Sequence, residues 1–528
     1  MATYIEMAGH GMNASAVQEA SHVGDTSLAS EVNTPVRRPP QAVGQRMARA
    51  AIWMALDIGG GQILSFLTYM VVARILGPSQ YGSFAIGMSL ISIANCLLIQ
   101  GFADSLIRLT DLKEEHISTT FWTNVAISAS ITLALQLASP LIAAAFHEPE
   151  LAPVVWWLAL LCLLQGLVSV QTVLCRREMD MAVFAIRSIT AWVLGGITAI
   201  GMALAGFGVW SLVVCQLVQS VISLLVLWNA TPWRPRLIFS VPAFRELAGF
   251  SRHVMAASLI GSLTERADTL VIGLFLDTTA VAYYALALRL LSAIAMATQI
   301  PIYQLVMPAL SPMANDLANF RRKYHEIVIL GHSIWMPIVT ALGATVPILL
   351  PMAFGTKWEP AVPVTEVMCL VGLASGLSAF TGPALFALGR PDLHAKLNAA
   401  RFVTTVLVLG VAAQFGILAV GIAWTSLMTL LVPLHLVVLH RVCGLEVKAL
   451  VTDAVKVSLA GATMAIAMTG VGWLGLDKVT SLLLALLLGA ATYLTTMETI
   501  FMRGYVTRML ELALRAAPLP FNLRKRSV

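Results

Sequence analysis

Charged side chains interrupt two neighbouring apolar stretches of the sequence, residues 250–276 and 281–306. Glu265, Arg266 and Asp268 lie in the first stretch, and Arg289 lies in the second. A charge in the hydrocarbon of a membrane costs roughly 2.5–3.5 kcal/mol on insertion scales, so each of these groups needs a partner or a function. Guanidinium groups match phosphate oxygens with paired hydrogen bonds. The two arginines therefore predict a binding patch for a diphosphate.

The depth of the two arginines supports one shared patch. At 1.5 Å per helical residue, Arg266 lies about 15 Å and Arg289 about 12 Å from the outer ends of their stretches. Arg266 has an alternative role, an internal ion pair with Glu265 or Asp268 that serves helix packing, and the sequence leaves both readings open. Arg289 has no acidic neighbour in its own stretch, which favours binding.

Two further arginines occupy matching places in the two halves of the chain. Arg187 and Arg401 each lie about five residues inside the inner end of an apolar stretch, which is little more than one helical turn. Arginine so close to an interface commonly extends to the lipid headgroups. The alternative is that the pair flanks an inner opening and meets an anionic headgroup first, and the sequence does not decide between the two.

Acidic residues are candidates for coupling to H⁺ or Na⁺. Asp57 precedes a run of three glycines, Gly59 to Gly61, which allows close packing or a kink and lacks the Lys and Ser/Thr of a phosphate loop. The alternative is that Asp57 binds no ion and simply lies near the membrane interface. Glu265 and Asp268 are the other candidates.

No cofactor or metal site is expected. The histidines in or beside apolar stretches have no metal-ligand spacing: His253, His332, His435 and His440. The 6 cysteines are scattered without redox or ligand spacing, so neither a disulfide framework nor a metal centre is expected.

Composition places these residues in a membrane protein. The chain has 528 residues, of which 58% are hydrophobic and only 11% charged, and its mean hydropathy is +0.83. These values lie far from those of soluble domains. The net charge of +6 does not indicate nucleic-acid binding, because in a membrane protein the placement of basic residues matters more than their sum.

Fourteen apolar stretches are long enough to cross a hydrocarbon core of about 30 Å. They are residues 51–73, 82–103, 120–146, 151–174, 182–205, 208–229, 250–276, 281–306, 327–352, 361–388, 397–417, 418–441, 450–473 and 479–501. Phe415-Gly416 is the only turn signal between the eleventh and twelfth. With both termini inside, the outer loops hold only Arg74, Lys357 and Lys478, as the positive-inside rule requires.

The sequence repeats weakly at an offset of about 200 residues. Residues 74–91 correspond to 274–291, and Leu151-Ala-Pro-Val corresponds to Ala361-Val-Pro-Val. One repeat unit contains six stretches, and an even number returns the chain to the same side, so the two units are parallel. We expect an all-α membrane protein with two six-helix bundles, related by a pseudo-two-fold axis along the membrane normal, plus two extra helices.

The expected organisation divides the chain into six parts. These are a disordered cytoplasmic tail (1–47), a first bundle (48–230), a cytoplasmic linker (231–247), a second bundle (248–445), helices 13 and 14 (446–502) and a basic cytoplasmic tail (503–528).

Five short motifs in order resemble a known family. RILGPSQYGSFA (74–85) looks like the R-x-L-G-x-x-x-Y-G signature of bacterial polysaccharide flippases, in the superfamily that also contains multidrug extruders and the lipid II flippase. The other four are Asp268-Thr-Leu-Val-Ile-Gly273, Tyr283-Tyr-Ala-Leu-Ala-Leu-Arg289, Met307-Pro-Ala-Leu-Ser311 and Phe354-Gly-Thr-Lys-Trp358. The resemblance covers about residues 48–445.

The resemblance implies a flippase of the bacterial cytoplasmic (inner) membrane. Its cargo would be undecaprenyl-pyrophosphate-linked oligosaccharide for exopolysaccharide, O-antigen or capsule assembly. Membrane lipids, a polysaccharide polymerase and a chain-length regulator are the partners so implied. A lipid II flippase and a multidrug extruder are the related alternatives, although an extruder of cationic drugs would favour acidic cavity groups. A membrane-embedded polymerase or ligase is the remote alternative, because the outer loops are too short to assemble a catalytic site.

Overall fold

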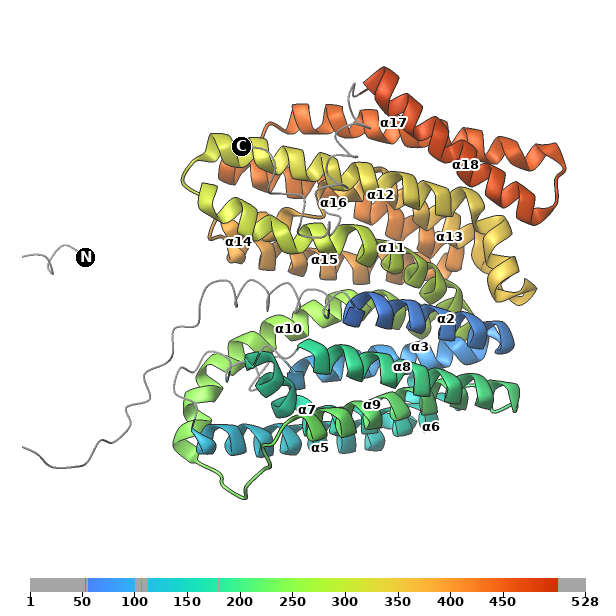
Figure 1. Cartoon of the computed structure of the whole chain (residues 1–528). Coiled ribbons are helices and arrows are strands. Elements are labelled where there is room, and N and C mark those ends of the chain that lie inside the picture. The colour runs from blue at the N-terminus through green and yellow to red at the C-terminus, as the bar shows by residue number, and fades with distance from the viewer. Residues whose placement is uncertain (1–52, 54–55, 100–105, 107–112, 179–180, 502–528) are drawn as a thin grey trace, which may run out of the picture. The chain divides into compact units, whose positions relative to one another are not determined.

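The computed structural model describes residues 53, 56–99, 106, 113–178 and 181–501, and within them every regular element is helical. The first half of the chain, which we define as residues 56–230, contains η1 (Leu56–Gly60), α2 (Gly61–Ile75), α3 (Pro78–Ile99), α5 (Glu114–Ala145), α6 (Leu151–Leu158), α7 (Leu160–Arg177), α8 (Met181–Leu204) and α9 (Trp210–Ala230). The helices run alongside one another as a layered bundle (Figure 1).

The second half, residues 241–443, contains α10 (Val241–Phe275), α11 (Thr278–Leu310), α12 (Leu317–Phe354), α13 (Val362–Cys369), α14 (Thr381–Ala387), α15 (Pro391–Ala412) and α16 (Ile417–Cys443). Short 3₁₀ turns join several of these helices: Ser311–Met313, Thr356–Ala361, Leu370–Leu373, Ser375–Leu377 and Ala413–Phe415. Two further helices, α17 (Val447–Val471) and α18 (Lys478–Thr496), follow it.

A helix lies in each of the fourteen predicted stretches. Among the described residues, 10 helices are long and apolar enough to cross a membrane, or up to 11 if the bent pair in 356–387 is one span, and α2 is a shorter apolar helix. The turn predicted at Phe415-Gly416 is confirmed, because α15 ends at Ala412 and Gly416 has a φ of 92°. That left-handed value favours glycine.

The tenth predicted stretch is a broken helix rather than a single regular one. Its two arms, Thr356–Leu373 and Ser375–Ala387, meet at a bend of 43°. Gly376 packs so closely on His332 that any side chain there would collide with the imidazole. The indole of Trp335 donates to the Ser375 hydroxyl at 3.2 Å. Irregular backbone in a membrane protein is tolerated where it is buried in protein or lines a cavity, and Ser375 lines a cavity here.

The two halves repeat the same order of helix contacts. In the first half, α2 packs on α8, α8 on α9, and α7 on α9. In the second half, α10 packs on α15, α15 on α16, and α13 on α16. The halves meet where α3 contacts both α10 and α11.

The last two helices lie beside the second half (Figure 1). α17 and α18 pack on each other and on α12, with a few contacts to α16. Their shared core includes Met336 of α12 with Met464, Met468 and Tyr493. Gly489 allows the close approach, because a side chain there would meet Met468.

The segment between the halves is held against the first half. The Trp122 indole donates to the Arg236 carbonyl at 2.8 Å, and the Trp233 indole donates to Glu114 Oε1 at 3.0 Å. The Ser240 amide donates to the Thr119 hydroxyl at 3.0 Å. These bonds order residues 233–240 ahead of α10, although this segment contains no helix.

Candidate functional site: a central cavity

A cavity of about 1240 Å³ lies between the two halves and is lined by helices from both. α2, α3, α7, α8 and α9 supply one wall, and α10, α11, α15 and α16 supply most of the other. Five of the predicted site residues line it: Glu265, Arg266, Asp268, Arg289 and Arg401. Arg187 and Asp57 are not among its lining residues.

Arg289 extends from α11 across the cavity to the first half. Its Nη2 donates to the Ser65 hydroxyl at 2.7 Å, and its guanidinium lies 3.7 Å from the centroid of the Tyr69 ring. A cation in this position is attracted by the ring quadrupole. Its Nε is buried and has no hydrogen-bond partner among the described residues. An unused buried donor is uncommon in proteins, and it leaves this guanidinium able to donate to a ligand.

Arg266 does not form the ion pair that was its alternative role. Its Nε donates to the Ser92 hydroxyl of α3 at 3.2 Å. Within the described residues, no carboxylate lies within 4.0 Å of it. Asp268 is buried and instead accepts hydrogen bonds from the Tyr284 hydroxyl at 2.8 Å and the Thr269 amide at 2.7 Å. Glu265 is exposed.

Arg401 belongs to a polar face of α15. His394, Asn398 and Arg401 follow at helical spacing and all line the cavity, with His435 of α16. The Asn398 amide and His394 Nε2 share a hydrogen bond of 3.1 Å. Like Arg289, Arg401 has a buried Nε that bonds to no other residue described by the structure. Sequence reasoning missed His394 and Asn398 and dismissed His435, although their spacing on one helix face was readable.

The predicted symmetry of Arg187 and Arg401 is not reflected in the cavity. Arg187 of α8 is half-buried, lies 5.2 Å from the Phe184 ring centroid and donates weakly to Ser188 at 3.4 Å. The charge of Asp57, in the π-helical turn η1 that packs on α8, acts on Arg187. The two arginines therefore differ in that only Arg401 lines the cavity.

Charge is divided unequally between the walls. Every Asp, Glu, Arg and His among the described lining residues comes from the second half. The first half supplies neutral polar and aromatic side chains: Gln62, Ser65, Tyr69, Ser89, Ser92, Asn95, Gln165, Trp192, Gln216 and Ser220. Tyr69 joins the walls, because Arg289 covers its ring and Gln216 donates to its hydroxyl at 2.8 Å.

Contacts between the halves close one end of the cavity. Arg74 donates to the Met352 carbonyl at 2.8 Å, and the buried Trp358 indole donates to the Ala73 carbonyl at 2.9 Å. The Ser79 and Thr278 hydroxyls lie 3.0 Å apart. We refer to these contacts as the closed end, and the topology predicts that it faces outward. Toward the other end, the lining includes Gln62, Tyr303 and His394, near the far ends of their helices.

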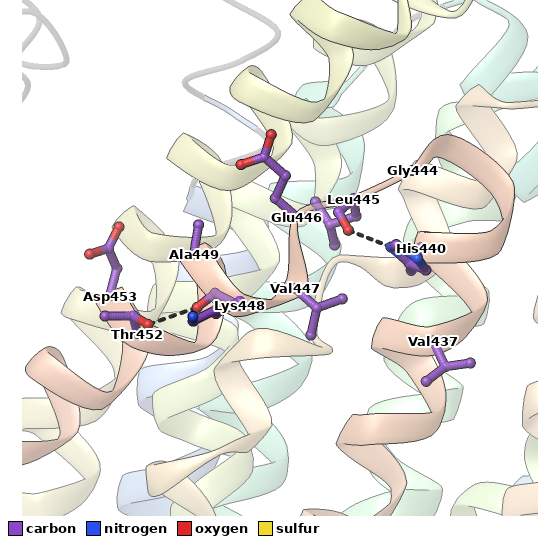
Figure 2. A pocket seen from close by; sticks show the side chains of 10 residues that line it. All are labelled: Val437, His440, Gly444, Leu445, Glu446, Val447, Lys448, Ala449, Thr452 and Asp453. Atoms are coloured by element: carbon purple, nitrogen blue, oxygen red, sulfur yellow. Dashed lines mark hydrogen bonds between the residues drawn. The ribbon is translucent and has the colours of Figure 1, made fainter.

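A second hollow of about 780 Å³ lies where α16 passes into α17. Figure 2 shows its side chains, among them His440, whose Nδ1 lies 2.8 Å from the Leu445 carbonyl oxygen. It contains none of the predicted site residues. In the described part of the chain, no group of three or more His, Cys, Asp or Glu is arranged to hold a metal ion, and all six cysteines are buried.

The helical fold and the cavity between two halves define a polytopic transporter-like membrane protein. The family model "Polysaccharide biosynthesis protein" matches residues 71–363. The chain belongs to this family, and the resemblance drawn from its motifs is confirmed.

Named relatives in two bacteria are similar to most of the chain. The succinoglycan biosynthesis transport protein ExoT of Rhizobium meliloti (strain 1021) is 25% identical over 390 residues, 73% of this chain and 78% of the relative. The lipopolysaccharide biosynthesis protein WzxC of Escherichia coli (strain K12) is 26% identical over 341 residues, 63% of this chain and 68% of the relative.

Solved structures share the fold. The lipid II flippase MurJ, in an inward closed conformation, superposes with a TM-score of 0.70 at 13% identity and covers 87% of this chain and 100% of its own. An inward-facing multidrug resistance MATE family transporter gives a TM-score of 0.59 at 15% identity, covering 76% and 99%.

Proposed function

We propose that the chain is a flippase that moves undecaprenyl-diphosphate-linked oligosaccharide from the inner to the outer leaflet of the bacterial cytoplasmic membrane. The observation that carries the proposal is the cavity between the halves, lined by three arginines, Arg266, Arg289 and Arg401. Among the described residues, none of the three has a carboxylate within 4.0 Å. Unpaired cations in a membrane protein are costly and mark a substrate path.

The chemistry of the three arginines suits a diphosphate. The buried Nε groups of Arg289 and Arg401 donate no hydrogen bond to any described residue. A phosphate oxygen would satisfy them with charge-assisted hydrogen bonds, which are about twice as strong as neutral ones. Arg187, beside Asp57 and outside the cavity lining, is left with the role of an interfacial residue near the inner surface.

Transport would follow by alternating access. The closed-end contacts would separate while the opposite end of the cavity closes, so that the two bundles (48–230 and 248–445) rock about the cargo. The proposal keeps fourteen crossings, a linker at 231–247, an added pair at 446–502, and cytoplasmic tails at 1–47 and 503–528. Polysaccharide polymerase and chain-length regulator proteins would receive the cargo on the outer side.

If transport is coupled to H⁺ or Na⁺, one of the three acidic candidates would bind the ion. Glu265 is exposed and lines the cavity. Asp268 is already satisfied by Tyr284 and Thr269, and Asp57 lies outside the lining. An exchanging ion needs a carboxylate that water can reach, which favours Glu265.

Arg289→Ala tests the proposal. Losing one charge-assisted contact of about 2 kcal/mol lowers cargo affinity about 30-fold. Polymer export should therefore fall severely in a strain that lacks the native gene, while lipid-linked intermediate accumulates and an immunoblot shows normal abundance. Arg289→Lys should rescue only partly, because an ammonium cannot reproduce the paired hydrogen bonds.

Ser65→Ala is the matched control. It removes the hydrogen-bond partner of Arg289 in the first half and leaves the guanidinium in the cavity. Export should stay near normal if Arg289 binds cargo, and should fall as in Arg289→Ala if that residue only ties the halves together. Full export by Arg289→Ala would overturn the diphosphate site.

A further inference from the structure

The neutral wall of the cavity carries hydrogen-bonding groups that the protein itself does not use. Asn95 Oδ1 is buried and has no hydrogen-bond partner in the described part of the chain. Gln62 and Gln165 also line the cavity, and no hydrogen bond joins either amide to another described residue. A carboxamide offers two donors and one acceptor oxygen. Leaving the buried Asn95 oxygen unpaired costs free energy, so it indicates a ligand or water.

Aromatic side chains stand among these amides. Trp192 lies 6.1 Å from Tyr69, ring centroid to centroid, at an interplanar angle of 63°. Tyr69 also contacts Tyr81 and Phe84 at 6.4 and 6.1 Å. Amides beside tryptophan and tyrosine suit a sugar, because a pyranose presents hydroxyls around its rim and C–H bonds on its faces. Tyrosine and tryptophan likewise combine an apolar ring with a polar handle.

We propose that the first-half wall formed by Gln62, Asn95, Gln165, Trp192 and Gln216, hereafter the amide wall, is a binding site for uncharged sugar residues. The site rests on the proposed flippase function and assigns the two walls to the two ends of one cargo. The diphosphate meets the arginines of the second half, and the glycan lies against the amide wall.

Tyr69 marks the junction between the two ends. Arg289 lies 3.7 Å from the centroid of its ring, and Gln216 of the amide wall holds its hydroxyl at 2.8 Å. A phosphate bound to Arg289 therefore places the first sugar beside Tyr69 and Trp192. Neutral amides bind hydroxyl groups without requiring a charge on the sugar, so we assign neutral hexoses to this wall.

The test compares two probes of equal charge that differ in sugar. One is the methyl ester of a polyprenyl diphosphate, and the other is the same lipid diphosphate linked to cellobiose. Binding of each to the purified full-length protein in detergent is measured by thermophoresis. We expect the glycosylated probe to bind about tenfold more tightly. Gln165→Leu with Asn95→Leu should abolish that difference and leave the affinity for the methyl ester unchanged.

Matched variants separate the outcomes. Gln414→Leu, at an exposed glutamine outside the cavity, should behave as wild type, and Arg289→Ala should weaken both probes alike. Equal wild-type affinity for the two probes, or equal weakening of both by the amide variants, would overturn the sugar site and leave the flippase proposal standing. Failure of the wild type to bind either probe would overturn the proposed function itself.

Discussion

Trp358→Phe perturbs the closed end of the cavity at its most buried point. Trp358 is fully buried, donates to the Ala73 carbonyl at 2.9 Å, and meets the Tyr81 ring edge-on at 5.5 Å between centroids. Phenylalanine removes the hydrogen bond, worth about 1 kcal/mol, and weakens the ring contact. If these contacts exist only while this end is closed, the loss of about 1.4 kcal/mol shifts the equilibrium about tenfold toward opening.

The assay is the reaction of a cavity cysteine with a membrane-impermeant maleimide added to spheroplasts. Ala85→Cys places the thiol on the cavity wall, and Cys96→Ala removes the native cysteine that lines the same cavity. In this background Trp358→Phe should speed labelling about tenfold. Trp473→Phe, at a side chain that is 93% exposed, should leave the rate unchanged. An unchanged rate in Trp358→Phe would refute the assignment of these contacts as a gate.

Two further predictions concern the linker and the topology. Trp233→Phe removes the hydrogen bond to Glu114 and should destabilise the protein by about 1 kcal/mol, seen as a lower melting temperature in detergent; an unchanged value would show that the linker is not fixed by this bond. Reporter fusions after Arg236 and Lys448 should report cytoplasm and those near Glu148 periplasm, and one inverted assignment would break the count of crossings.

Local features of the fold were readable from the sequence because they depend on few neighbouring residues. The turn at Gly416 follows from one glycine between two apolar stretches, and its φ of 92° is one that glycine adopts freely. The break in the tenth stretch was not anticipated. Its glycines and prolines signalled irregularity, but the bend depends on the fit of Gly376 against His332, which is remote in sequence.

The sequence predicted the arginines of the candidate site but not the residues that they contact. Helix depth alone brought Arg266 and Arg289 to one cavity, but the contact of Arg289 with Tyr69 joins helices 220 residues apart and leaves no local pattern. The expected likeness of Arg187 to Arg401 does not extend to the cavity, which only Arg401 lines. In the sequence, histidines were considered only as metal ligands, which does not predict the polar face of α15.

The crossing of the halves at Gly82 has an electrical consequence. A side chain at this position would collide with the carbonyl of Thr278, so the backbones of α3 and α11 meet with no room for water between them. Without a close contact of this kind, ions could leak across the membrane through a protein with a hollow of about 1240 Å³. The absence of a side chain at Gly82 thus allows α3 and α11 to meet at this point, and we expect the contact to limit ion leakage through the cavity.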